Sequence, residues 1–329
     1  MLYASMVVRP GIDCPMKKRW LSSAAALTLF AVFLLRSGPA REGAARGLVL
    51  WADILVPSLL PFFAAAGLLS RLGLPEALGR RLPGRRFSGP GAGLFLLGLS
   101  GGYPLGAASV AQAVRAGRLS RADGDRLLFF CDNSGPAFAV GALGVGVFGS
   151  AGWGLFLWGI HALAALALAL LTPGKKDDEG RENVSPSALP FPRALTESVS
   201  GAVSALLNIG GYVVFFSALL GVGEAPGFPG LISDILSRRF GWEAAALRAL
   251  FAGCLELSSG VGAMAGMAVT PGHLALAEFL LSWGGLCVHL QAASVTADAG
   301  LDLSRRLRGK LLHGLISAAA AYAASRVML

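Results

Sequence analysis

An acid, an amide and a hydroxyl stand side by side at Asp132-Asn133-Ser134, within one of the most apolar stretches of the chain. Gly135-Pro136 follows at once, and glycine next to proline stops a helix. A helix that stops inside a bilayer exposes backbone N–H and C=O groups, which is costly unless protein or a polar cavity receives them. The break therefore predicts a polar site within a membrane.

The same chemistry recurs at two other places. Ser100-Gly101-Gly102-Tyr103-Pro104 interrupts one apolar run, and Glu256-Leu257-Ser258-Ser259-Gly260 borders another. The N-terminal ends of half-helices present free N–H groups and positive dipole ends, which suit carboxylates. Hydroxyl and amide side chains would add specificity, although they serve equally well as hydrogen bonds between helices. The predicted substrate-binding residues are Ser100, Gly101, Gly102, Tyr103, Asn133, Ser134, Ser258, Ser259 and Gln291.

Asp132 and Glu256 are predicted to hold a coupling ion, either Na⁺ or a proton. An acid at a helix centre costs about 2.5–3.5 kcal/mol on insertion scales, so it usually faces a polar interior. The alternative is a structural hydrogen bond or cap to the broken backbone. The residue types alone leave both interpretations open.

The other titratable side chains give weaker signals. His161, His289 and His313 lie on apolar stretches without ligand-like spacing and are interpreted as structural, and the four cysteines form no C-x-x-C pair. We therefore expect no metal and no cofactor. The chain has no Walker A motif, no H-E-x-x-H and no G-x-S-x-G, so we expect that it is not an enzyme.

Composition indicates whether these residues lie in a soluble protein or in a membrane protein. The mean hydropathy is +0.64, and 14% of residues are charged against about a quarter in a soluble domain. A span needs roughly 20 apolar residues, and the candidate runs are 20–35, 54–70, 87–114, 133–174, 198–223, 257–277, 279–297 and 311–325. These runs are continuously apolar rather than alternating, which excludes a β-barrel and predicts an all-α polytopic membrane protein embedded in a lipid bilayer.

The net charge of +9 is interpreted as a mark of topology. Cytoplasmic loops collect Lys and Arg, and with a cytoplasmic N-terminus most of the 28 Lys and Arg residues fall in cytoplasmic segments, among them 305–310. We therefore expect no nucleic-acid partner. The apolar runs offer no Arg or Lys to pair with a dianion, which favours a neutral solute.

The polar, proline-rich segment 175–193 divides the membrane part into two similar halves. Leu-Ser-Gly-Gly from residue 99 matches Leu-Ser-Ser-Gly from residue 257, and Asn133 follows the first at the same distance as Gln291 follows the second. Interrupted apolar segments at 56–63 and 207–212 precede them. The predicted domains are 1–45 with a first transmembrane helix, 46–174, the cytoplasmic loop 175–193, and 194–329.

The orientation makes this repeat inverted, because 54–70 would run inward and 198–223 outward. Inverted repeats with interrupted helices are the construction of secondary transporters, whose site lies near the midplane. Run 87–114 would be about 42 Å long as one helix, against a core of about 30 Å. We therefore expect a re-entrant hairpin that turns at 101–106, with a twin around 258–262 entering from the opposite side.

The N-terminus admits more than one interpretation. Met16-Lys17-Lys18-Arg19 before run 20–35 looks like an alternative start, and the stretch also resembles a signal peptide with small residues at 37–40 near the cut. We favour a retained first helix.

Four motifs resemble the sporulation integral membrane protein YlbJ family, which belongs with the nucleoside-recognition, or Gate, domain proteins. They are VPSLLPFF (56–63), LSGGYPLGA (99–107), FFCDNSGPAF (129–138) and ELSSG (256–260), and the resemblance runs from about Arg46 to Leu329. Asp132 stands where the family pattern also has Asn, so an ionic role for Asp132 need not be a family trait.

The resemblance implies a Gate-type transport fold and a role in endospore formation, in which dipicolinate leaves the mother cell across the outer forespore membrane. The first hypothesis is thus a secondary transporter of a small polar or anionic solute. The alternatives are a nucleoside permease that uses the same site, and a non-transporting membrane scaffold for spore assembly. Substrate, coupling ion and the formation of a homo-oligomer stay open.

Overall fold

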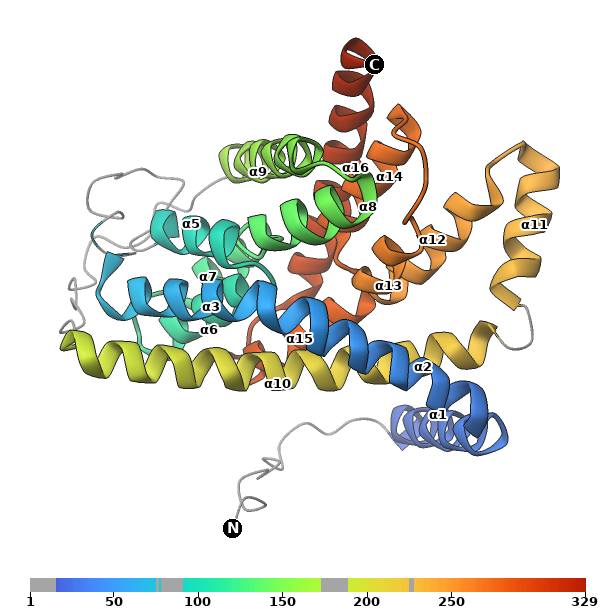
Figure 1. Ribbon diagram of the computed structural model, residues 1–329. Helices are drawn as coiled ribbons and strands as arrows, with labels where there is room; N and C mark the ends of the chain where they lie inside the picture. Colours follow the sequence, from blue (N-terminus) through green and yellow to red (C-terminus); the bar gives the residue numbers. More distant parts are fainter. Residues whose placement is uncertain (1–15, 75–76, 78–90, 173–188, 225–227) are drawn as a thin grey trace.

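The computed structural model describes residues 16–74, 77, 91–172, 189–224 and 228–329, and all regular structure within these ranges is helical (Figure 1). Within these ranges, five helices are long and apolar enough to cross a membrane, by length and composition: Ser37–Arg71, Ala151–Leu171, Phe191–Glu224, Pro271–Ala299 and Leu303–Met328. The prediction of an all-α integral membrane protein is confirmed. Cys14 and most of the loop 175–193 lie outside the described residues.

The first half of the chain is a series of helices, and most of the connection between α3 and α5 lies outside the described residues. Their bounds are α1 Met16–Leu35, α2 Ser37–Val49, a π-helical stretch Leu50–Leu55, α3 Val56–Arg71, α5 Gly91–Gly101, α6 Leu105–Arg115, α7 Arg121–Leu128, a second π-helical stretch Ala137–Val145, α8 Gly146–Phe148 and α9 Ala151–Leu171.

The described residues of the second half of the chain are also mainly helical. It contains α10 Phe191–Glu224, α11 Phe228–Phe240, α12 Ala244–Leu255, α13 Leu257–Gly262, α14 Pro271–Trp283, α15 Gly285–Thr296, a short 3₁₀ turn Ala297–Ala299 and α16 Leu303–Met328.

The continuous stretch from α2 to α3 packs along α10, and the two run in opposite directions (Figure 1). Gly47 lies against Ser217 at one end and Gly67 against Ser198 at the other. Between them the Trp51 indole donates a hydrogen bond of 2.8 Å to the Leu206 carbonyl oxygen. Small side chains allow this close approach of helices in a membrane.

The predicted interruptions at 56–63 and 207–212 do not break these helices. α3 accommodates Pro61 in its interior, and α10 continues through residues 207–212 for its full 34 residues. Gly210 in this segment lies against the Trp51 ring, so its small size serves packing rather than a turn. Local composition alone overstated the irregularity here.

The predicted break in run 87–114 is confirmed as two separate helices, α5 and α6. Gly102 turns the chain with φ of +85°, and a cis peptide joins Tyr103 to Pro104. The two helices contact each other. A Cβ on Gly106 would lie 2.3 Å from the Cys131 carbonyl oxygen, so only glycine permits the segment around Asp132 to pack here.

The second half is broken more often than its apolar runs suggest. α12 ends before Glu256, which has extended backbone, and α13 is a helix of six residues. Run 257–277 is thus not one span, because α14 begins at Pro271. Gly284 and Gly285 have φ of +83° and +76° and separate α14 from α15.

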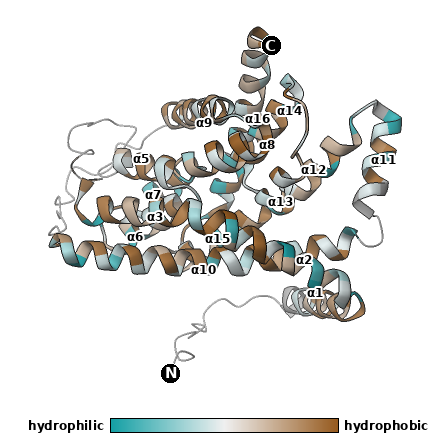
Figure 2. Cartoon of the chain, viewed as in Figure 1, coloured by the Kyte–Doolittle hydropathy of each residue, from teal (hydrophilic) through white to brown (hydrophobic). Residues whose placement is uncertain are grey.

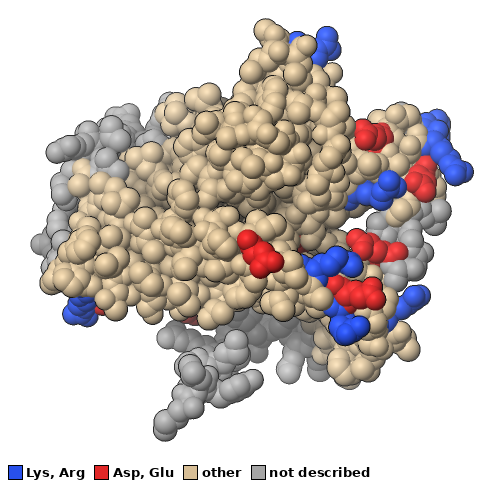
Figure 3. All heavy atoms as spheres, viewed as in Figure 1, with Lys and Arg blue, Asp and Glu red and all other residues tan. Residues whose placement is uncertain are grey.

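The outer surface matches a lipid environment. Many large apolar side chains on the long helices are exposed, such as Leu163 at 67% and Leu207 at 61%, and brown hydrophobic positions are spread over the helices in Figure 2. The face seen in Figure 3 carries few charges over its centre, and they gather toward the end where α2, α11 and α12 lie. Apolar side chains facing outward in such a band are typical of a protein that spans a bilayer.

Candidate functional site

The break between α5 and α6 and the break between α12 and α13 both border one small cavity inside the protein. Its volume is about 50 Å³, and it receives Gly102 from the α5–α6 break and Ser258 from the α12–α13 break. The predicted site residues that line it are Gly102, Tyr103, Ser134, Glu256, Ser258 and Gln291. Segments more than a hundred residues apart in the sequence therefore meet at a common point. The rest of the wall is mostly apolar, with Phe138 and Val288 among its members.

The other predicted residues lie around this cavity rather than on it. Ser100 is exposed, and its hydroxyl donates to the Leu97 carbonyl oxygen at 3.2 Å. Gly101 is buried at the end of α5. Asn133 is fully buried behind the cavity, and Ser259 faces a second, larger pocket.

Glu256 holds the first turn of α13. Its two carboxylate oxygens accept backbone N–H bonds from Ser258 at 3.0 Å and from Ser259 at 2.6 Å. A side-chain oxygen at this position satisfies N–H groups that the helix itself cannot. The cap that was one interpretation of Glu256 is therefore present, while a role in ion coupling stays a prediction.

Asp132 plays the same part for α6, although it comes from a distant segment. One carboxylate oxygen accepts the Ala107 N–H in the first turn of α6 at 3.1 Å. The other accepts a hydrogen bond of 2.8 Å from Nε of Arg306 on α16. The half-helix N-termini that were expected to present free N–H groups to a substrate thus bind two carboxylates of the protein.

Arg306 and Lys310 are the site residues that the sequence reasoning missed. Segment 305–310 was predicted to be cytoplasmic loop, yet α16 begins at Leu303, and the two side chains are 1% and 0% exposed. The expectation that no cation lies within the apolar core is wrong. The available signal was helical spacing, since Arg306, Lys310, His313 and Ser317 follow one another at intervals of four and three residues and share a helix face.

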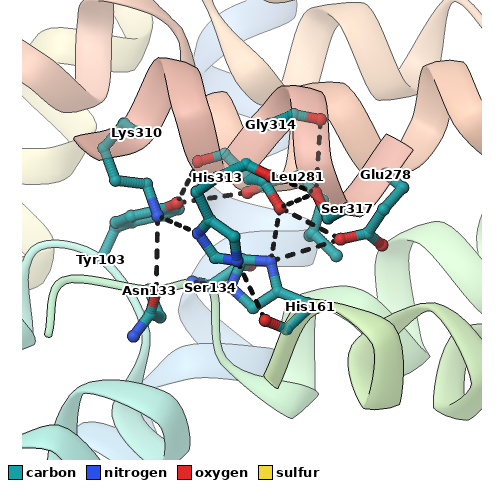
Figure 4. A network of polar contacts seen from close by, with 11 residues as sticks. Tyr103, Asn133, Ser134, His161, Glu278, Leu281, Lys310, His313, Gly314 and Ser317 are labelled. Carbon is teal, nitrogen blue, oxygen red and sulfur yellow. Dashed lines mark hydrogen bonds and ion pairs between the residues drawn. The ribbon is translucent and has the colours of Figure 1, made fainter. Parts of the chain in front are cut away.

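Lys310 contacts groups from two other segments and one on its own helix (Figure 4). Its ammonium donates to Oδ1 of Asn133 at 3.4 Å and to Nδ1 of His313 at 2.9 Å, and it lies 5.0 Å from the centroid of the Tyr103 ring. Nε2 of His313 donates in turn to the His161 carbonyl oxygen at 2.9 Å. Within the described part of the chain, no carboxylate forms an ion pair with this ammonium. The site therefore has a buried amine directly behind residues that line the cavity.

A second chain of contacts runs from the cavity to α14 (Figure 4). The Ser134 backbone N–H donates to Nε2 of His161 at 3.1 Å, so the ring proton of His161 is on Nδ1. This Nδ1 donates to Oγ of Ser282 at 2.8 Å, and Ser282 donates to Oε1 of Glu278 at 3.0 Å. His161 is therefore the neutral imidazole. The rings of His161 and His313 lie 4.4 Å apart.

Glu278 was overlooked because it appeared as the boundary between runs 257–277 and 279–297. It lies inside α14 and is 0% exposed. The signal was available, because a single acid between two long apolar runs is expensive in a bilayer and usually functional. Among the described residues, no three His, Cys, Asp or Glu side chains lie close enough to hold a metal ion.

The larger pocket has a volume of about 760 Å³ and lies on the other side of α13. Arg46, Glu224 and Arg248 line it, with Arg46 paired to Glu224 at 3.0 Å. Ser258 lines both pockets. Helix α13 thus separates a small inner cavity from a pocket of the size that holds small-molecule ligands, about 300–1,000 Å³.

Comparison with known proteins gives one informative match. The sporulation integral membrane protein YlbJ of Bacillus subtilis (strain 168) is 28% identical over 309 residues, which cover 84% of this chain and 75% of the relative. The match confirms the resemblance to the YlbJ family that the motifs indicated. No family model and no solved structure matches the chain.

Proposed function

We propose that this YlbJ-family protein is a secondary transporter for a small carboxylate-bearing solute, and that during endospore formation its cargo is dipicolinate in the outer forespore membrane. The observation that carries the proposal is the meeting of Gly102 and Ser258, the tips of two separate helix breaks, in one cavity. Broken helices at membrane depth are tolerated where they line such a site. Alternating access around paired breaks is the mechanism of many secondary transporters.

Charge favours an anion over a neutral nucleoside. Arg306 is neutralised by Asp132, whereas Lys310 has only neutral hydrogen-bond acceptors and the Tyr103 ring around its ammonium. An anionic ligand bound beside this amine would favour its charged form. Ser134, Ser258 and Gln291 on the cavity wall would add hydrogen bonds that select among anions.

The cavity must widen before a solute enters, because about 50 Å³ suits water molecules rather than an aromatic dicarboxylate. Helix α13 is the element whose movement would join the cavity to the larger pocket, since Ser258 borders both. This rearrangement is the step that exposes the site to one side of the membrane.

The test is flux through purified protein in liposomes. Dipicolinate and nucleosides are offered separately, each with and without Na⁺ and pH gradients, to the wild type and to Asn133→Ala. We expect saturable dipicolinate flux that nucleosides do not inhibit, and its loss in Asn133→Ala with normal folding. Nucleoside flux without dipicolinate flux would favour the permease, and no flux of either would favour the scaffold.

A further inference from the structure

Glu278 is a buried acid that does not line the cavity and has no role in the proposed binding of the solute. It is 0% exposed on α14, and Oε1 accepts the Ser282 hydroxyl. Oε2 is fully buried and has no hydrogen-bond partner among the residues that the structure describes. A carboxylate in this position would have half of its hydrogen-bonding capacity unmet.

No cation on the helices around α14 contacts this carboxyl group. From α9, His161 lies 3.5 Å away through Nδ1 and is held neutral by the Ser134 N–H. From α16, His313 and Lys310 bond to each other. The single charged side chain of α12, Arg248, pairs with Asp234 at 3.5 Å.

Of the nearby buried acids, Glu256 binds the Ser258 and Ser259 N–H groups, and Asp132 pairs with Arg306 of α16. An isolated ionised carboxylate in such surroundings is strongly disfavoured, and a buried acid without a cation takes up a proton instead. We propose that Glu278 carries the coupling proton of the transporter and exchanges it with the cavity through Ser282 and His161. This inference rests on the proposed transport function.

The relay follows the contacts in Figure 4. When Ser134 moves as the cavity opens, Nε2 of His161 becomes free to accept a proton. Nδ1 then releases its own proton to Oγ of Ser282, while the Ser282 hydroxyl proton passes to Glu278. One proton has entered and one has reached the carboxylate, the imidazole is neutral again as the other tautomer, and the reverse sequence unloads Glu278.

The experiment compares the wild type, Glu278→Gln and the surface control Glu197→Gln in liposomes with dipicolinate as the probe. The glutamine keeps the shape of Glu278 and cannot be ionised. We expect Glu278→Gln to lose accumulation driven by a pH gradient while it still exchanges internal for external dipicolinate, because exchange needs no net proton movement. Accumulation at the wild-type level in Glu278→Gln would overturn the inference.

Infrared difference spectroscopy gives a readout that does not depend on transport. The wild type should show the C=O band of a protonated, buried carboxyl group, and Glu278→Gln should lack it. A band that persists in Glu278→Gln contradicts the inference. Absence of dipicolinate flux in the wild type would instead overturn the proposed function, and the infrared band would still decide whether Glu278 holds a proton.

A second variant, Ser282→Ala, tests the relay even where Glu278→Gln does not fold. This variant keeps the acid and removes the hydroxyl through which it is loaded. We expect the infrared band to remain and accumulation to slow relative to exchange. Equal slowing of accumulation and exchange would count against the relay.

Discussion

The two helix breaks solve the same problem by different means. In each, a carboxylate binds the N–H groups that follow the break: Asp132 serves α6, and Glu256 serves α13. Asp132 comes from another segment and is fixed by Arg306 of α16. Glu256 adjoins its own helix and forms no ion pair among the described residues. The cap of the first break is thus tied to a distant helix, whereas the cap of the second belongs to its own segment.

Packing adds a second difference between the breaks. At the first break, a Cβ on Gly106 would overlap the backbone of the segment that contains Asp132. At the second, Gly260 packs as closely, because its Cβ would lie 2.2 Å from the Gly253 Cα of α12, whereas Ser259 and Gly262 face the large pocket. We infer that α13 is held against α12 on one face and borders open space on the other.

Removal of the buried ion pair between Arg306 and Asp132 should have the largest effect on stability, because only the first break depends on this pair. Arg306→Ala leaves Asp132 as an uncompensated buried charge, which typically costs about 3–5 kcal/mol. We expect a large fall in the thermal unfolding temperature of the detergent-solubilised protein, with Arg305→Ala, an exposed neighbour on the same helix, as the control. Equal unfolding temperatures for the two variants would show that the first break does not depend on this pair.

Glycine substitution tests the tight packing of the first break. Gly106→Ala should destabilise the protein by about 1–3 kcal/mol, because the new methyl group overpacks against the Cys131 carbonyl oxygen. Gly211→Ala, on α10 with nothing within 4 Å of its Cβ, is the matched control and should be neutral or slightly stabilising. The measurement is again thermal unfolding, and a neutral Gly106→Ala would mean that the backbone there shifts freely.

Removal of the cap tests the second break. Glu256→Ala should cost about 0.5–2 kcal/mol, the usual range for a lost N-cap. The effect should be local, so hydrogen exchange should accelerate at the amides of Ser258 and Ser259 and stay unchanged in α6. Faster exchange in α6 as well would mean that the two breaks form a single cooperative unit.

Thiol labelling gives the smallest and most local contrast. In a variant whose native cysteines are replaced by serine, Ser259→Cys should react with a water-soluble maleimide, because Ser259 lines the large pocket. Ser134→Cys should react much more slowly, because that side chain is 2% exposed. Similar rates at the two positions would place the cavity in open contact with water and remove the role of α13 as its boundary.

The sequence predicted what depends on local chemistry. Glycine and proline at 101–104 stop a helix for reasons contained in those residues, and the structure has a break there; the second break lies at Glu256, whereas Ser258, Ser259 and Gly260 lie inside α13. The same reasoning erred at 56–63 and 207–212, where Pro61 and Gly210 fit inside continuous helices because neighbouring helices accept them. Inverted symmetry and re-entrant entry into the bilayer remain predictions.

What the sequence concealed is the pairing of charges across helices. Arg306, Lys310 and Glu278 were assigned to the ends of apolar runs, because hydropathy treats any charge as a boundary. Their burial depends on partners far away in the sequence, such as Asp132 for Arg306. Apolar run lengths carry no information about such partners, whereas the regular spacing of polar residues along α16 does.

Ser258 touches the inner cavity on one face and the large pocket on the other. At this position a single serine therefore separates the inner cavity from the large pocket. We therefore expect that displacement of α13 alone would connect them, without a tilt of any of the long helices.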